Sequence, residues 1–80
     1  MEDLLKRITF NRDVLVGKPL VRGLRISVEM ILELLANGAS EQEILEDFRE
    51  LEPDDIRAAL FYALTTVSRE TVLDRVPSSM

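Results

Sequence analysis

Three cations that are close together in the chain are the side chains best suited to bind a ligand. Lys18, Arg22 and Arg25 lie within eight residues that also hold one proline and one glycine. Cations on a short ribbon can contact the phosphate oxygens of a nucleic acid. We therefore take these three as candidate nucleic-acid-binding residues. The sequence leaves open the alternative that the two arginines pair with acidic residues of the same chain, such as Glu29 or Glu33.

The same stretch does not match a nucleotide-binding loop. Gly17-Lys18-Pro19 lacks the spacing G-x-x-x-x-G-K-[ST], and no strand–loop–helix pattern surrounds the lysine. Gly17 and Gly23 are better explained as turn residues with φ > 0, and Pro19 fixes the chain direction between them. We expect no cofactor.

The residue types argue against an enzyme. The chain has no histidine and no cysteine, so it lacks the commonest general base and the strongest nucleophile. The remaining candidates are carboxylates crowded within residues 41–50, namely Glu41, Glu43, Glu46, Asp47 and Glu50. A metal site would need acids from more than one element facing inward, and this spacing favours a solvated acidic face instead. We expect neither catalytic nor metal-binding residues.

Charge divides the chain into two parts. Residues 1–28 hold six cations and three acids, and residues 29–80 hold four cations and twelve acids. The front end therefore has a net charge of +3 and the rest of the chain −8. Because an acidic surface repels phosphate, only the front end could contact a nucleic acid.

The elements that must position these residues begin with short strands. Residues 1–7 are expected to form a frayed lead-in, followed by short apolar runs at 8–10, 14–16 and 20–21. Turn residues separate these runs, which is typical of a small antiparallel ribbon. An isolated ribbon is only marginally stable, so it must pack on the helices or pair with a second chain. Its edges are an obvious place for dimerisation.

Helical patterns follow from residue 28 onward. Ser27 is a suitable N-cap for a first helix, and Asn37-Gly38 would end it with Gly38 in the left-handed position. Ser40 and Glu43 form a capping-box pattern at the start of a second helix, predicted over about 41–49.

A third helix is predicted from Pro53 to about Ser68. Asp54 and Asp55 would complement its positive end. Its expected buried residues are Ile56, Ala59, Leu60, Ala63, Leu64 and Val67. Three helices joined by short connections predict a tri-helical bundle, and the second and third have the lengths of a helix-turn-helix.

Some apolar side chains do not fit the predicted buried stripes. Phe61 and Tyr62 are two of these, and a cluster of them with Val14 or Val16 would make a partner-binding surface. These four residues are the candidate partner-binding residues.

The 80 residues are expected to form a single domain, 1–80, near the lower size limit for a single core. It divides into a strand-and-turn region (1–26), a three-helix bundle (27–68) and a C-terminal extension (69–80). The first twenty residues carry seven charged side chains and no apolar segment of the kind found in signal peptides, so we expect no signal peptide. No apolar run approaches the length of a membrane span. We expect a soluble, cytoplasmic protein without membrane contact.

Several motifs in this order resemble the bacterial family called domain of unknown function 433. The resemblance spans about residues 8–62. Its motifs are Gly17-Lys18-Pro19, Arg22-Gly23-Leu24-Arg25-Ile26, Asn37-Gly38, Ser40-x-x-Glu43-Ile44-Leu45, Phe48, Leu51-x-x-x-Asp55-Ile56-x-Ala58-Ala59-Leu60 and Tyr62-Ala63. Leu24 departs from the family pattern, in which a threonine is common at this position.

The resemblance implies a homeodomain-like, helix-turn-helix bundle preceded by short strands. It also implies an antitoxin of a type II toxin–antitoxin pair, with a PIN-like ribonuclease as partner and operator DNA bound by a homodimer. Our leading hypothesis is accordingly a non-enzymatic antitoxin that neutralises the nuclease by protein–protein contact. Its acidic surface could cover the basic RNA-binding face of the nuclease. The alternative is a dimeric transcriptional regulator that contacts phosphates through its basic N-terminal segment.

Overall fold

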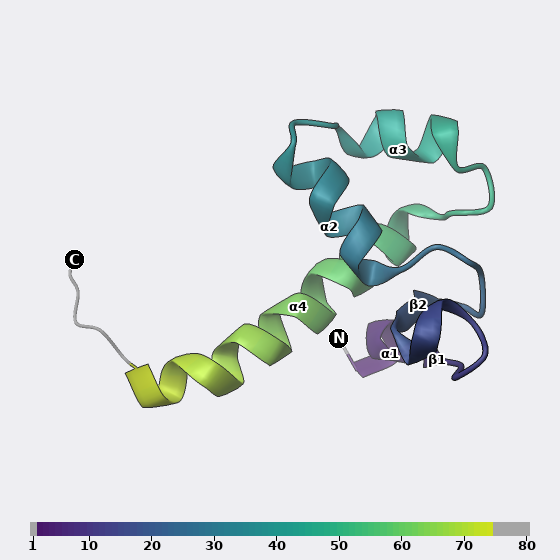
Figure 1. Cartoon of the computed structure of the whole chain (residues 1–80). Helices are drawn as coiled ribbons and strands as arrows, with labels where there is room; N and C mark the ends of the chain where they lie inside the picture. Colours follow the sequence, from purple (N-terminus) through teal and green to yellow (C-terminus); the bar gives the residue numbers. More distant parts are fainter. Residues whose placement is uncertain (1, 75–80) are drawn as a thin grey trace.

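The computed structural model describes residues 2–74, and the side chains of residues 3–68, as a mainly helical fold with a short antiparallel sheet (Figure 1). Its elements are, in chain order, α1 (Glu2–Leu5), β1 (Ile8–Phe10), the 3-10 turn η1 (Leu15–Gly17), β2 (Pro19–Val21), α2 (Val28–Ala36), α3 (Glu41–Asp47) and α4 (Pro53–Asp74). The predicted class, a small helical bundle preceded by short strands, is confirmed. Within residues 2–74, no helix combines the length and apolar content that crossing a membrane requires.

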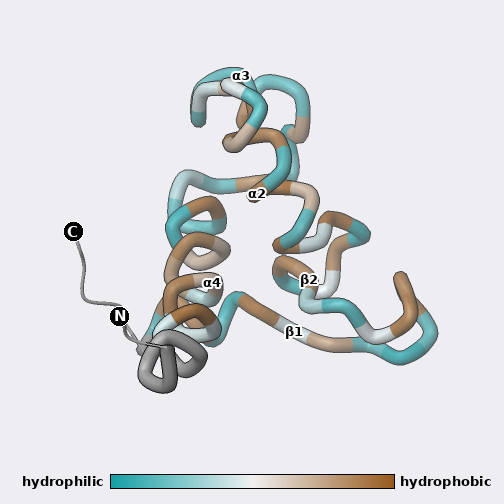
Figure 2. The backbone as a smooth tube through the Cα atoms, turned by 60° about the vertical axis from the view of Figure 1, so that its left-hand side comes forward, coloured by the Kyte–Doolittle hydropathy of each residue, from teal (hydrophilic) through white to brown (hydrophobic). Residues whose placement is uncertain are grey.

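The two strands form the predicted ribbon at 8–10 and 19–21. Thr9 lies opposite Leu20, and the backbone N–H of Arg22 donates to the carbonyl of Arg7 at 2.7 Å, which extends the ladder by one step. On its other side β2 is bridged at Leu20 to Ser27. β2 is therefore hydrogen-bonded on both sides, whereas β1 lies at the border of the molecule (Figure 2).

The second predicted apolar run, residues 14–16, is not a strand, contrary to the prediction. Leu15, Val16 and Gly17 have φ angles of 50°, 56° and 76°, so the chain makes a left-handed turn there. The amides of Gly17 and Lys18 close it by donating to the carbonyls of Val14 and Leu15. A left-handed backbone is unfavourable for a β-branched residue such as valine, which prefers an extended backbone. The prediction of a strand at 14–16 followed from that preference.

The lead-in is also more ordered than predicted. Residues 2–5 form the short helix α1, which packs against α4. The amides of Lys6 and Arg7 donate to the carbonyls of Asp3 and Leu4 at 3.3 and 3.0 Å, so the turn after α1 is tied down. The carbonyl of Arg7 then enters the sheet ladder, which fixes this residue on both sides.

The predicted ends of the first two bundle helices are confirmed. The Ser27 hydroxyl accepts from the Met30 amide at the start of α2. At its end Gly38 has φ 99°, and the amides of Gly38 and Ala39 donate to carbonyls of the last turn, the pattern of a Schellman motif. Ser40 and Glu43 make both bonds of the capping box. α3 ends at Asp47, two residues earlier than predicted.

The third bundle helix, α4, is longer and more exposed than predicted. It runs to Asp74 instead of ending near Ser68, so residues 69–74 of the predicted C-terminal extension belong to the helix. The rest of that extension, residues 75–80, lies outside the described residues. Ile56 and Ala59 are buried as predicted. Leu60, Leu64 and Val67 were predicted to be buried, but they are 44%, 55% and 52% exposed. The reason is that α2 and α3 are short, so the later part of α4 extends past them (Figure 1).

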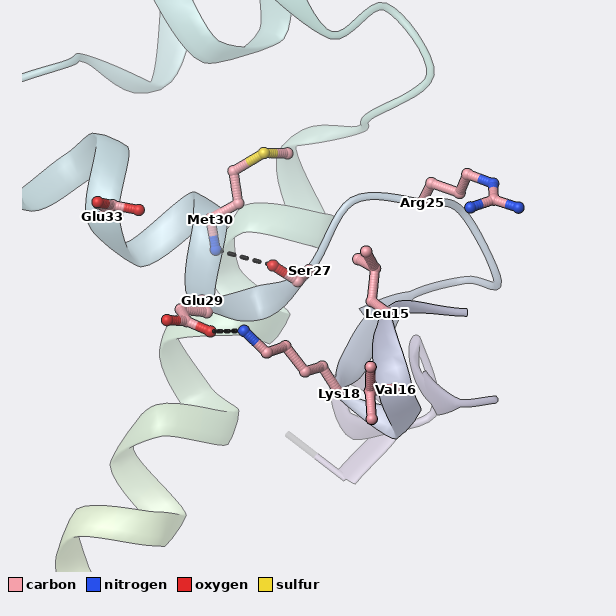
Figure 3. Close-up of a pocket in the computed structure, with 8 residues that line it drawn as sticks. All are labelled: Leu15, Val16, Lys18, Arg25, Ser27, Glu29, Met30 and Glu33. Atoms are coloured by element: carbon pink, nitrogen blue, oxygen red, sulfur yellow. Dashed lines mark hydrogen bonds and ion pairs between the residues drawn. The ribbon is translucent and has the colours of Figure 1, made fainter. Parts of the chain in front are cut away.

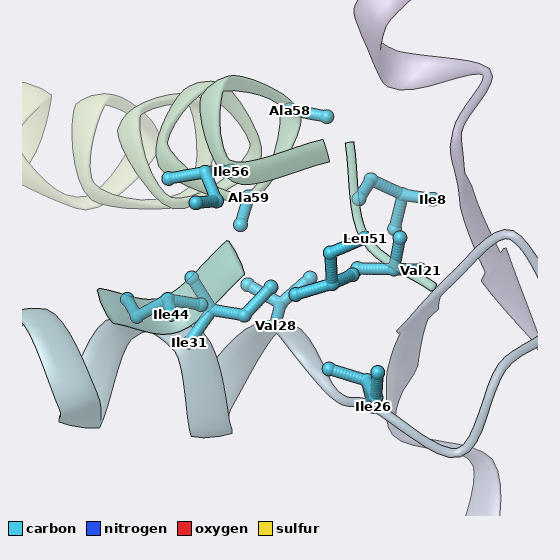
Figure 4. Packing of buried hydrophobic residues seen from close by; sticks show 10 residues of the cluster. All are labelled: Ile8, Val21, Ile26, Val28, Ile31, Ile44, Leu51, Ile56, Ala58 and Ala59. Atoms are coloured by element: carbon cyan, nitrogen blue, oxygen red, sulfur yellow. The ribbon is translucent and has the colours of Figure 1, made fainter. Parts of the chain in front are cut away.

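The core lies where the ribbon, α2, α3 and the first turns of α4 meet (Figure 4). Its buried residues come from every one of these elements: Ile8, Val21, Ile26, Val28, Ile31, Ile44, Leu51, Ile56, Ala58 and Ala59. The ribbon therefore belongs to the same core as the helices, and it positions Arg22 against the start of α4.

Candidate functional site

Arg22, one of the candidate nucleic-acid-binding residues, is bound to a carboxylate within the molecule. Its Nε and Nη2 donate to the two carboxylate oxygens of Asp55 at 3.0 and 2.8 Å, a two-bond arrangement. Nη2 also donates to the carbonyl of Glu50 at 2.6 Å. Arg22 itself adopts a left-handed backbone, φ 46°, in a tight turn with Gly23, and the amide of Leu24 closes this turn by donating to the carbonyl of Val21.

Asp55 also binds two donors other than Arg22. Nη1 of Arg7 donates to its Oδ1 at 2.9 Å, and the backbone amide of Glu52 donates to its Oδ2 at 2.8 Å. The second bond caps α4, because Asp55 is the third residue of this helix. The Asp55 side chain is fully buried, and Arg7 and Arg22 are each about one-third exposed. We call Arg7, Arg22 and Asp55 the ion-pair junction.

The junction keeps Asp55 ionised. Burial alone would raise the pKa of Asp55, but hydrogen bonds from Arg22, the Glu52 amide and Arg7 outweigh burial and lower this pKa below its usual value. The pKa of Arg22 is raised by its hydrogen bonds to Asp55. Hydrogen bonds to Glu52 and then to Asp55 raise the pKa of Arg7. The junction therefore holds its charges over the whole range in which proteins are usually folded.

The open question about Arg22 has a structural answer. It pairs with an acidic residue of the same chain, but this residue is Asp55 and not Glu29 or Glu33. In the sequence analysis Asp55 was expected only to complement the positive end of the helix. Its pairing with Arg22 and with Arg7 was not predicted. A signal was present: Asp55 lies four residues before the buried Ala59, so both fall on the inward face of the helix.

The other two candidate cations lie apart from the junction. Lys18 Nζ pairs with Glu29 at 2.6 Å, with both side chains at least half exposed (Figure 3). Lys18 and Arg25 border one pocket of about 500 Å³ between η1 and α2, which Arg22 does not line. The Arg25 side chain points away from the Lys18–Glu29 pair (Figure 3) and makes no hydrogen bond or ion pair with the described residues.

The four candidate partner-binding residues do not form one cluster. Val16 is 91% exposed on the left-handed turn, and Val14 is half-buried beside it. Phe61 and Tyr62 are both half-buried but line different grooves of α4. The Tyr62 ring contacts that of Phe10, with 6.2 Å between ring centres.

The largest apolar exposure on a helix lies on α4. Leu60 and Leu64 line a shallow groove of about 230 Å³ with Leu4, Arg57 and Phe61. Val67 continues the same side of the helix one turn later, at the spacing i, i+4, i+7. We call Leu60, Leu64 and Val67 the α4 stripe. A stripe of this kind on a helix that passes its neighbours is suited to binding another protein.

The acidic residues around α3 face solvent. Glu41, Glu43, Glu46, Asp47 and Glu50 are all exposed. No group of three or more potential metal ligands comes together among the described residues. Glu43 has a structural part in the capping box, and the others give the surface of α3 its negative charge.

Comparison with known proteins gives a family but no activity. The chain is similar to an uncharacterised protein, y4eO, of Sinorhizobium fredii, with 38% identity over 56 residues. These 56 residues are 70% of the chain. The matched segment is about 25% of that protein's length. No solved structure is significantly similar to the chain. The family model described as "Protein of unknown function (DUF433)" matches residues 8–63, and the chain therefore belongs to this family.

Proposed function

We propose that the protein is a cytoplasmic antitoxin that binds and neutralises a PIN-like ribonuclease through the α4 stripe. The observation that carries this proposal is the exposure of Leu60 and Leu64 on a helix that extends past the bundle. Exposed leucines at this spacing can be covered by a hydrophobic groove of a partner. The nuclease itself comes from the family resemblance.

Charge supports a basic partner. Residues 29–80 carry a net charge of −8, and the acidic side chains of α3 are exposed. A ribonuclease needs a basic face to hold RNA, and opposite charges speed the encounter of the two proteins. In this proposal the acidic surface directs the approach, and the α4 stripe supplies the apolar contact that holds the complex.

The proposal is tested by co-expression with a PIN-like ribonuclease encoded beside the gene. We expect the two proteins to co-purify and the antitoxin to suppress RNA cleavage. Leu64→Glu should weaken both effects, because it places a charge in the apolar contact. Val16→Glu is the matched control, since it makes the same kind of change at an exposed residue on the left-handed turn between the strands. Absence of a complex would contradict the proposal, and equal effects of the two variants would reject the α4 stripe as the surface.

A second candidate function, regulation of transcription by DNA binding, has one observation in its favour. Lys18 and Arg25 border the same pocket, and Arg25 makes no ion pair within the described residues. The junction weakens this candidate, because Arg22 would have to leave Asp55 to reach a phosphate. Affinity for DNA should fall steeply with salt, and Arg25→Ala should reduce the logarithmic salt slope by about one unit. A flat salt response would exclude phosphate contact.

A further inference from the structure

β1 has one edge with no hydrogen-bonding partner in the described part of the chain. Neighbouring pairs of an antiparallel ladder alternate between bonded and non-bonded. The bond between Arg22 and Arg7 therefore makes Thr9–Leu20 the next bonded pair. The backbone groups of Ile8 and Phe10 consequently point away from β2. This agrees with the residue opposite Phe10, Pro19, which has no N–H to donate.

An apolar groove runs beside this open edge. It has a volume of about 400 Å³ and is lined by Leu5, Ile8, Phe10, Tyr62 and Thr65. Phe10 is 59% exposed although its ring already contacts Tyr62. Unpaired backbone donors and acceptors next to an apolar groove are the features by which a sheet edge binds a further strand.

We propose that β1 pairs antiparallel with β1 of a second copy of the chain, about a two-fold axis at Thr9. In this register Ile8 of one copy lies opposite Phe10 of the other. The outward N–H and C=O of both residues then form four hydrogen bonds between the copies, and the two ribbons become one four-stranded sheet. Phe10 is covered on the groove face by Ile8 of the second copy, a favourable aromatic–aliphatic cross-strand pair.

We propose a second copy of the chain, and not a strand of a different protein, because the open edge of β1 is complementary to itself. The open edge has its donors and acceptors at two positions placed symmetrically about Thr9, so it matches itself without any shift. This is the geometry of an isologous two-fold interface. The proposal does not rest on the antitoxin proposal. Tyr62 and Thr65 on the groove face a different side of α4 from Leu60 and Leu64.

The first test separates edge pairing from side-chain burial at a single residue. Phe10→Ala and Phe10→Pro both remove the ring, but only proline removes the outward N–H, and this N–H has no part in the β1–β2 ladder. We expect a concentration-dependent dimer of the full chain by analytical ultracentrifugation. Phe10→Pro should raise its dissociation constant about tenfold or more beyond the effect of alanine. Circular dichroism checks that both variants keep the fold.

The second test uses the absence of cysteine from the chain. The two Thr9 residues would face each other as a non-bonded pair, in which Cα atoms are about 4.5 Å apart and a disulfide can form. Thr9→Cys should cross-link rapidly under mild oxidation, and Arg12→Cys on the exposed turn beyond the strand should not. A monomer at all concentrations, a dimer that Phe10→Pro leaves intact, or a dimer lost only on Leu64→Glu would each overturn the proposal.

Discussion

The two parts of α4 differ in what their side chains contact. In the first two turns, Asp55 holds both arginines of the ion-pair junction, and Ile56, Ala58 and Ala59 are fully buried. From Leu60 onward, the apolar side chains Leu60 and Leu64, on another side of the helix, are 44% and 55% exposed. The helix is continuous across this change, so the difference comes from its neighbours and not from its own conformation.

One continuous helix therefore has a buried first part that stabilises the fold and a second part with exposed apolar side chains. The first part joins the ribbon to the bundle, and a change there should act on the free energy of unfolding. In the second part Leu60 and Leu64 are exposed, and a change there should act on the proposed binding of a partner. Substitutions in the two parts should therefore give separate effects, and the following predictions test this separation.

The largest effect is expected at Asp55. Asp55→Ala removes the carboxylate that two arginines and the Glu52 amide share, and it should lower the free energy of unfolding by about 3 kcal/mol. Asp54→Ala is the matched control, because this neighbouring side chain is half exposed and makes only ion pairs longer than 3.5 Å. The control should cost under about 0.5 kcal/mol. Urea unfolding measures both, and equal losses would mean that the junction adds nothing.

A smaller loss is expected at Arg22. Arg22→Ala leaves Asp55 with Arg7 and the Glu52 amide, so the cost should be about 1.5–2 kcal/mol. Arg22→Lys should not restore stability, because an ammonium cannot make the two-bond contact with the carboxylate. Arg25→Ala, without an ion pair in the described structure, should change stability little. Restoration by lysine would show that charge alone matters.

The free energy of unfolding should decrease at acid pH because Asp55 becomes protonated. Its pKa is lower in the folded protein than in the unfolded chain, so the unfolded state binds a proton first as the pH falls. The contribution of Asp55 is therefore complete above its unfolded pKa and is lost as the pH falls through its folded pKa. Asp55→Asn should flatten this part of the profile in acid unfolding experiments. If Asp55→Asn and the wild type lose stability equally as the pH falls, Asp55 does not contribute to the pH dependence as proposed.

The smallest effect on stability is expected in the α4 stripe. Leu64→Ser should change the free energy of unfolding by under about 0.5 kcal/mol, because the side chain is already more than half exposed. Thermal unfolding measures this change. A large loss would show that the stripe packs against something in the isolated protein and that the two parts of α4 are not separate.

Local signals made most helix ends predictable. Ser27, Gly38 and the pair Ser40–Glu43 act on backbone groups within a few residues, so their roles can be assigned from sequence alone. The family was also identified correctly from short motifs around these positions.

The errors arose where distant contacts decide the outcome. The spacing of Leu60, Leu64 and Val67 indicates an apolar stripe but not whether a neighbouring helix is long enough to cover it. The role of Asp55 depends on arginines 33 and 48 residues away in the chain. The left-handed turn at Leu15 and Val16 opposes their intrinsic preference, so no local signal indicates it.

The ion-pair junction has a consequence for folding during synthesis. Asp55 binds Arg22 and Arg7 across 33 and 48 residues, so the ribbon cannot dock until the start of α4 has been made. At bacterial or eukaryotic translation speeds, the 33 residues from Arg22 to Asp55 take roughly 2–7 s to add. For that time both strands and their cations are exposed on the nascent chain. The two strands are therefore synthesised before Asp55, the residue whose ion pairs hold the ribbon to α4.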